Sequence, residues 1–261
     1  MNRIASVMVM QARDRGTWLL GPWIVLGVTF VIVWFIALSI DLLWKGTIQT
    51  YTGALACIDI VMLAVAIGTV LGTFPFAVGF GIRRRDYLLG TLAWSVAYCA
   101  SWAILLGLLS LIEANVIKNW GVGLHFFHLP FFSDGSPLRQ FCWSSSPFDL
   151  YCVHSDPNYV SGGSSLQQFW VYFVLLLFMY LLGMLLGSIY QRFGRTGEFF
   201  FFGIVFLLLS VFVLLSSYWH WWGTISGWFA RQTAAALGLW LVPLMACFAL
   251  VSYVLLRKAR V

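Results

Sequence analysis

A short basic turn between two apolar segments holds the residues with the clearest potential for chemistry. Residues 74–91 read FPFAVGFGIRRRDYLLGT, so a glycine-rich helix end runs into Arg83, Arg84 and Arg85, and the acid Asp86 follows. The guanidinium groups can anchor the turn on lipid phosphates, or they can pair with carboxylates of another protein. Both interpretations stay open, and the turn is the first candidate site.

Asp59 is the acid that falls deepest inside a predicted membrane span. It follows the start of that span by about seven residues, which places it roughly 10 Å along the helix. A carboxylate in lipid is costly and often functional, and Asp59 would then be a polar contact on a substrate pathway. The alternatives are a carboxylate hydrated from the membrane surface and a helix that starts later than predicted.

The longest non-spanning segment, residues 113–168, contains side chains that could bind a metal or form a disulfide. Their spacing matches no zinc signature, so no metal site is expected. A disulfide between Cys142 and Cys152 is favoured, because both lie outside the spans in an oxidising exterior. The metal-capable side chains are His125, His128, His154, Cys142 and Cys152, whereas Cys57, Cys99 and Cys247 lie within spans.

Sequence motifs of common catalytic sites are missing. The chain contains no HExxH, no GxSxG and no GxxxxGK[ST] phosphate loop. An intramembrane enzyme would need paired catalytic groups at one depth, whereas Asp59 is the one acid well inside a predicted span, and Asp41 lies two residues from the end of another. Without a phosphate loop the chain cannot itself hydrolyse ATP in the usual way. We expect a protein that is not an enzyme and has no cofactor of its own.

The composition fixes the environment in which these groups must work. Of 261 residues, 9% are charged and 61% are hydrophobic, and the mean hydropathy is +0.90. A soluble domain carries roughly 25% charged residues. The net charge of +6 does not indicate a nucleic-acid-binding protein, because the basic residues stand in short clusters between apolar runs. The chain is expected to be an integral membrane protein.

Six apolar runs are long enough to cross a bilayer as helices, which need about 20 residues each. Because these runs are apolar on every face, the expected fold is an all-α polytopic bundle forming a single transmembrane domain over residues 1–261. Residues 1–17 are expected to form an interfacial elbow helix, residues 113–168 a loop or cap, and the tryptophan-rich residues 219–232 an interfacial or re-entrant segment. The predicted spans are residues 18–43, 52–78, 88–112, 169–190, 199–218 and 234–256.

Lysine and arginine are distributed unevenly between the two sides that these spans define. Eleven of the 15 lie at the two ends of the chain and in two of the turns, although the other side has more loop sequence. The positive-inside rule then predicts both termini in the cytoplasm and residues 113–168 outside. The eleven are Arg3, Arg13, Arg15, Arg83, Arg84, Arg85, Arg192, Arg195, Arg257, Lys258 and Arg260.

Two pairs of glycines have the GxxxG spacing that permits close contact between helices. They are Gly68 with Gly72, and Gly183 with Gly187. We interpret both pairs as contacts within one chain rather than as dimerisation motifs, although dimerisation stays open.

The basic turn resembles a feature of the ABC-2 type permeases, the membrane subunits of bacterial ATP-binding-cassette transporters. Residues 119–132 (NWGVGLHFFHLPFF) and 190–200 (YQRFGRTGEFF) also look like stretches of such permeases. The resemblance implies a short helix around residues 82–89 that contacts a cytoplasmic ATPase. Its coupling residues would be Ile82, Arg83, Arg84, Arg85, Asp86 and Tyr87. Residues 133–165 are longer than expected for the family.

The resemblance further implies a plasma-membrane exporter built from two such chains, identical or related, and from two ATPase subunits that bind ATP and magnesium. Family dimers are joined mainly by the first and fifth helices. The substrate stays unidentified within the classes of lipids, drugs, peptides and polysaccharides. Two alternatives stay open: a non-transporting membrane anchor, sensor or resistance protein, and an intramembrane enzyme.

Overall fold

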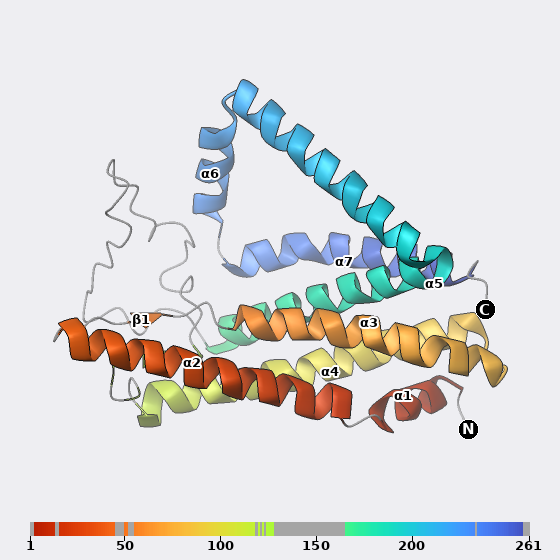
Figure 1. The fold of residues 1–261 in the computed structure, drawn as a ribbon, viewed down its shortest axis with the longest axis horizontal. Coiled ribbons are helices and arrows are strands. Elements are labelled where there is room, and N and C mark those ends of the chain that lie inside the picture. Colours follow the sequence, from red (N-terminus) through yellow and green to blue (C-terminus); the bar gives the residue numbers. More distant parts are fainter. Residues whose placement is uncertain are drawn as a thin grey trace.

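The computed structural model describes residues 3–13, 16–44, 50–51, 55–117, 120, 122, 124–127, 165–232 and 234–257, which are almost entirely helical. A two-residue parallel pair joins β1 (Thr50–Tyr51) to β2 (Leu124–His125). The predicted all-α class is confirmed (Figure 1). The helices are α1 (Arg3–Arg13), the π-helix η1 (Gly16–Leu20), α2 (Gly21–Trp44), α3 (Ala56–Gly79), α4 (Arg84–Ile112), the π-helix η2 (Glu113–Ile117), α5 (Ser165–Tyr218), α6 (Trp222–Arg231) and α7 (Ala234–Arg257).

Five helical stretches among the described residues are long and apolar enough to cross a membrane. Each exceeds the roughly 20 residues that a hydrocarbon core of about 30 Å requires. The chain is therefore a multi-pass membrane protein, as its composition predicts. The five stretches are Trp18–Leu42, Ala56–Gly79, Arg84–Ile117, Leu166–Tyr218 and Ala236–Arg257.

Helix α5 is much longer than one crossing needs. Its 54 residues would measure about 80 Å if they were straight. The helix is interrupted at Gly194, where φ is 68° and ψ is −164°, a conformation that glycine adopts without the penalty of a side chain. In Figure 1 the chain reverses its direction along the molecule at this bend. The sequence predicts two helices here, 169–190 and 199–218, and the bend lies between them.

The first half of α5 forms the centre of the bundle, where it packs against α3, α4 and α7. A Cβ atom added to Gly183 would lie 2.4 Å from the carbonyl oxygen of Leu63 on α3. At Gly187 the nearest atom would be Cβ of Val70, at 3.0 Å. The interpretation of this glycine pair as an intrachain contact is confirmed.

Gly68 and Gly72 lie on a different face of α3. No described atom lies within 4 Å of the place that a Cβ atom would occupy at either residue. The predicted intrachain contact is therefore not formed by this second pair within the described residues.

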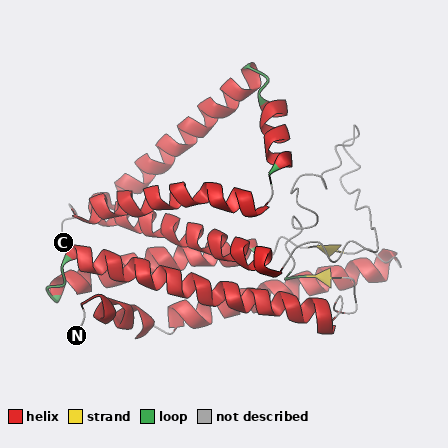
Figure 2. Ribbon diagram, turned by 180° about the vertical axis from the view of Figure 1, so that it is seen from behind, coloured by secondary structure: helices red, strands yellow, loops and turns green. Residues whose placement is uncertain are grey.

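The second half of α5 carries apolar side chains that are exposed all around the helix. Phe199 is 77% exposed, Phe206 73% and Leu214 68%. Figure 2 shows this half standing away from the bundle and joined to it again through α6 and α7. A helix that is apolar on every face is typical of a lipid environment.

Helix α1 lies against α4 rather than standing free. Val7 is fully buried, and the side-chain amide of Gln11 donates a hydrogen bond of 2.8 Å to Oγ1 of Thr91. Since one face of α1 is packed against the bundle, its position is fixed by protein contacts.

Candidate functional site: the basic end of the bundle

The turn between α3 and α4 brings the predicted coupling residues to one end of the bundle. The backbone N–H of Gly81 donates to the carbonyl of Val78 at 2.9 Å, and that of Ile82 donates to Ala77 at 3.0 Å. Gly81 has a left-handed φ of 76°, which is common just after a helix. Arg83 is extended, with φ −65° and ψ 137°, and α4 starts at Arg84.

The separate short helix expected around residues 82–89 is not formed. Residues 84–89 are instead the first turns of the 29-residue helix α4. Hydropathy places the start of this span at residue 88, because the charged residues before it interrupt the apolar run. A helix can continue through such residues when its first turn lies outside the apolar core, and Asp86 is favoured near the positive N-terminal end of the helix dipole.

The three arginines of the turn have different surroundings. Arg83 and Arg85 are exposed, whereas Arg84 is half-buried. Nη1 of Arg84 donates to the carbonyl oxygen of Arg257 at 2.6 Å and more weakly to that of Leu256 at 3.4 Å. These carbonyls end α7, where a cation is favourable and where no further turn donates hydrogen bonds to them. Arg84 therefore joins the α3–α4 turn to the end of α7.

Tyr87 is a correction to the predicted contact surface. Its side chain is fully buried, and its hydroxyl group shares a hydrogen bond of 2.8 Å with Oγ1 of Thr73. Its ring meets that of Phe74 edge-on, with the centroids 5.3 Å apart. The ring of Tyr87 thus packs in the core of this chain instead of lying on the exposed surface of the turn.

The remaining predicted coupling residues lie at the margin of the turn. Ile82 is half-buried and packs against the core cluster that contains Tyr87, and Asp86 is half-buried in the first turn of α4. Sequence reasoning singled out neither Phe80, which is 81% exposed, nor Phe76, which is 67% exposed. The sequence does contain a pattern that could have identified them. Two phenylalanines four residues apart at the end of a span lie on one side of a helix.

Further basic residues lie at the same end of the bundle. Figure 1 shows the α3–α4 turn, the bend of α5, helix α1 and the end of α7 all at this end. Arg195 is exposed after the bend, and the guanidinium carbon of Arg192 lies 4.8 Å from the ring centroid of Phe193. We call this region the basic end. The arginines of these segments include Arg13, Arg83, Arg84, Arg85, Arg192, Arg195 and Arg257.

Asp59 lies in the first turn of α3, far from the basic end. About 20 residues of helix separate it from the α3–α4 turn, which corresponds to about 30 Å. It is half-buried and borders a cavity of about 10 Å³ together with Leu106 and Tyr172. That volume suits about one water molecule. This cavity is too small for a substrate, and the structure does not join the two predicted sites.

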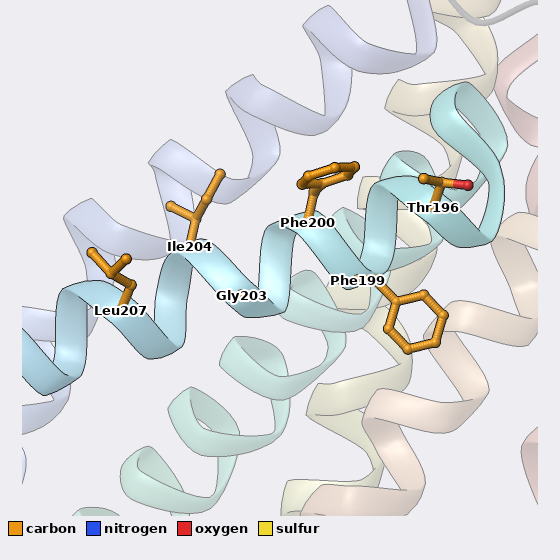
Figure 3. Close-up of a pocket in the computed structure, with 6 residues that line it drawn as sticks. All are labelled: Thr196, Phe199, Phe200, Gly203, Ile204 and Leu207. Atoms are coloured by element: carbon orange, nitrogen blue, oxygen red, sulfur yellow. The ribbon is translucent and has the colours of Figure 1, made fainter.

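A larger cleft of about 300 Å³ runs along α5 just after its bend. Figure 3 shows Phe200, Ile204 and Leu207 on one side of the helix and Phe199 on another. The cleft is lined by Thr196, Phe199, Phe200, Gly203, Ile204 and Leu207. With one hydroxyl group among apolar side chains, this lining suits acyl chains better than catalysis.

Several predicted groups fall partly or wholly outside the described residues. Cys142 and Cys152 both lie outside the described residues, and their disulfide stays a prediction. Cys57, Cys99 and Cys247 are free thiols. In the described part of the chain, no cluster of three or more metal-ligating side chains occurs.

Glu113 is a buried polar residue that sequence reasoning missed. It is 1% exposed at the end of α4, and the backbone of a later segment surrounds its carboxylate. The signal was present, since an acid directly follows an apolar run, but hydropathy alone assigns such an acid to solvent.

No family model, curated protein or solved structure matches this chain. The resemblance to the ABC-2 type permeases therefore stays a hypothesis that rests on the residues quoted for it.

Proposed function

We propose that this chain is the membrane-spanning permease subunit of an ATP-binding-cassette exporter and that it crosses the membrane six times. The break of α5 at Gly194 supports six crossings, because each half is then about one bilayer long. Crossings of alternating direction put both termini, the α3–α4 turn and the α5 bend on one side. The abundance of arginine there supports a cytoplasmic location of that side, in a bacterial plasma membrane.

The proposal rests on the exposed pair Arg83 and Arg85 at the α3–α4 turn, which follows the exposed Phe80 in the chain by three residues. Such a surface combines charges that can pair with carboxylates and an aromatic side chain that can fill a pocket. Arg84 connects this surface to the end of α7. A movement of a docked ATPase at the turn would then reach α7 directly as well as α4.

The partners follow from the same proposal. A cytoplasmic ATPase subunit supplies ATP, magnesium and the phosphate loop that this chain lacks. A second permease chain covers apolar faces of α2 and of the second half of α5, which are exposed in the single chain. A substrate pathway would form between two such chains, and Asp59 would contribute to it from the outer half. Helix α1 would be the elbow at the inner interface, with its exposed face toward lipid headgroups.

A non-transporting membrane anchor or sensor is the second candidate. The small volume of the cavity beside Asp59 favours this candidate. A chain that only anchors a partner needs no passage for a substrate. The two functions differ in whether ATP turnover depends on a transported compound.

Purification of the tagged chain from its native membranes in mild detergent tests the proposal. The expected result is a stoichiometric complex with a protein that carries a GxxxxGK[ST] loop and hydrolyses ATP. Recovery of the chain without any such ATPase, under conditions that preserve other membrane complexes, would contradict the function. An ATPase whose turnover responds to no lipid, drug or peptide would favour the anchor.

A further inference from the structure

Glu113 lies at the end of the bundle opposite to the basic end, where α4 passes into η2. A buried carboxylate is costly unless hydrogen bonds replace the water that it loses. Here Oε1 accepts a bond of 2.8 Å from the indole Nε1 of Trp120 and one of 2.6 Å from the backbone N–H of Phe126. Oε2 accepts a bond of 2.7 Å from the backbone N–H of Phe127. Both oxygens are therefore engaged by charge-assisted hydrogen bonds.

All three donors belong to one segment, and we call its described residues the strap: Trp120, Val122 and residues 124–127. The strap is also packed against α2, because the ring of Phe30 meets those of Trp120 and Phe126 at centroid distances of 4.7 and 5.1 Å. Leu124 and Phe126 are fully buried. Trp120 has a φ of 51°, which is uncommon for a residue other than glycine and needs surrounding contacts to hold it.

Two further contacts fix the strap to the bundle. The hydroxyl group of Tyr172 on α5 donates to the carbonyl oxygen of Phe127, and β2 pairs with β1 near the start of α3. Tyr172 also lines the small cavity that Asp59 borders. One side chain thus contacts both the strap and the enclosed space beside Asp59.

We propose that the strap is a gate that closes this end of the bundle over Asp59, and that the carboxylate of Glu113 holds it shut. When the carboxylate is removed, two backbone N–H groups and one indole lose their acceptor together, and buried donors without a partner are costly. The strap then separates as one unit, and the contact of Tyr172 with Phe127 is lost with it. Water gains access to the cavity beside Asp59. The gate is independent of the proposed transport function, so the membrane chain alone suffices to test it.

Hydrogen–deuterium exchange of the full chain in lipid nanodiscs measures the closure directly. In Glu113→Ala the amides of Phe126 and Phe127 are expected to exchange faster by about tenfold or more. Glu113→Gln keeps the size of the side chain and one acceptor, and it is expected to give an intermediate rate. Asn115→Ala is the matched control, because Asn115 is exposed near the same helix end and bonds only within its own turn, to the carbonyl of Leu111.

A second readout separates a gate from a merely structural contact. Asp59→Cys is introduced alone and together with Glu113→Ala, and its labelling by a small water-soluble thiosulfonate is measured by mass spectrometry. The expected result is slow labelling in the single variant and markedly faster labelling in the double variant. Unchanged labelling at this position would overturn the gate, even if the strap amides exchange faster.

Two outcomes of the exchange experiment would also overturn the proposal. The first is wild-type protection of Phe126 and Phe127 in Glu113→Ala. The second is loss of protection throughout α3 and the first half of α5 in both Glu113 variants, since Glu113 would then support the whole bundle rather than a separable strap.

Discussion

Single residues of the same type have different roles in this chain. Arg84 binds the last carbonyls of α7, while Arg83 and Arg85 stay exposed on either side of it. Arg83 precedes α4 in extended backbone and Arg84 begins the helix, so the three side chains do not have equivalent surroundings. The proposed contact with an ATPase therefore rests on Arg83 and Arg85, and Arg84 has an internal role.

Replacement of Arg84 by glutamine tests this division of roles. The end of α7 is expected to lose about 1 kcal/mol of local stability, because a cation at a helix C-terminus and its hydrogen bonds are removed. Amides of the last turn of α7 should then exchange about fivefold faster. Arg85→Gln is the control, since Arg85 is exposed in the same turn. Equal exchange in the last turn of α7 in both variants would refute the internal role of Arg84.

The sequence predicted the location of the basic turn but not the orientation of its side chains. Arg83, Arg84 and Arg85 are chemically identical, and only the position of α7 decides that the middle one finds carbonyl acceptors. Tyr87 was misassigned for a related reason, because a tyrosine beside charged residues fits a surface as well as a core. Glu113 was missed because its three donors come from residues that follow it by 7 to 14 positions.

The approach of α5 to α3 depends on two glycines one helical turn apart. Gly183 has no room for a side chain, because the carbonyl oxygen of Leu63 would lie 2.4 Å from the new Cβ atom. Gly68 on α3 has the same residue type and lies in a helix, but no described atom lies within 4 Å of its Cβ position. Substitutions at Gly183 and Gly68 can therefore be compared directly, with Gly68 as the control.

Gly183→Ala is expected to destabilise the chain by about 1–3 kcal/mol, because the backbones of α3 and α5 must move apart. Gly68→Ala is expected to be neutral or to gain up to about 1 kcal/mol from the higher helix propensity of alanine. Thermal unfolding in detergent, followed by size-exclusion chromatography, compares the two. Equal melting temperatures for both variants would mean that the close α3–α5 contact does not form.

Helical spans were predictable because hydrocarbon thickness imposes a minimum length on apolar runs. The predicted range 234–256 and helix α7, Ala234–Arg257, differ by one residue at the end. The start of α4 was less predictable, since a helix start depends on capping geometry and hydropathy detects only apolar runs. The sequence could not predict which glycine pair forms the close contact between α3 and α5. Both pairs have the same spacing, and only the fold distinguishes them.

For the molecule as a whole, the proposed six crossings depend on the bend of α5. Six crossings put Arg85 and Arg195 on one side of the membrane and Trp222 on the other, because half of α5 lies between Arg195 and Trp222. A single long crossing by α5 would instead put Arg195 within the hydrocarbon core, at high cost.

Cysteine labelling in intact cells distinguishes these topologies. An impermeant maleimide is added to cells that carry Arg85→Cys, Arg195→Cys or Trp222→Cys. The labelling of the unaltered chain, which has native cysteines, is subtracted as background. Only Trp222→Cys is expected to react before the cells are opened, and all three afterwards. Rapid labelling of Arg85→Cys in intact cells would reverse the orientation, and an unreactive Arg195→Cys in opened cells would argue against six crossings.

In the proposed function, an ATPase docks on the exposed arginines of the α3–α4 turn. The most direct test is the amount of ATPase that copurifies with the double variant Arg83→Ala/Arg85→Ala, compared with Arg13→Ala/Arg195→Ala, which removes two exposed arginines elsewhere at the basic end. Loss of one partner of a buried charge pair costs about 2–5 kcal/mol, so the first variant should lose most of its ATPase and the second should keep it. If the turn only binds lipid phosphates, each charge contributes about 1 kcal/mol to membrane binding, and both variants would retain wild-type amounts of ATPase. That result would rule out docking of an ATPase on Arg83 and Arg85.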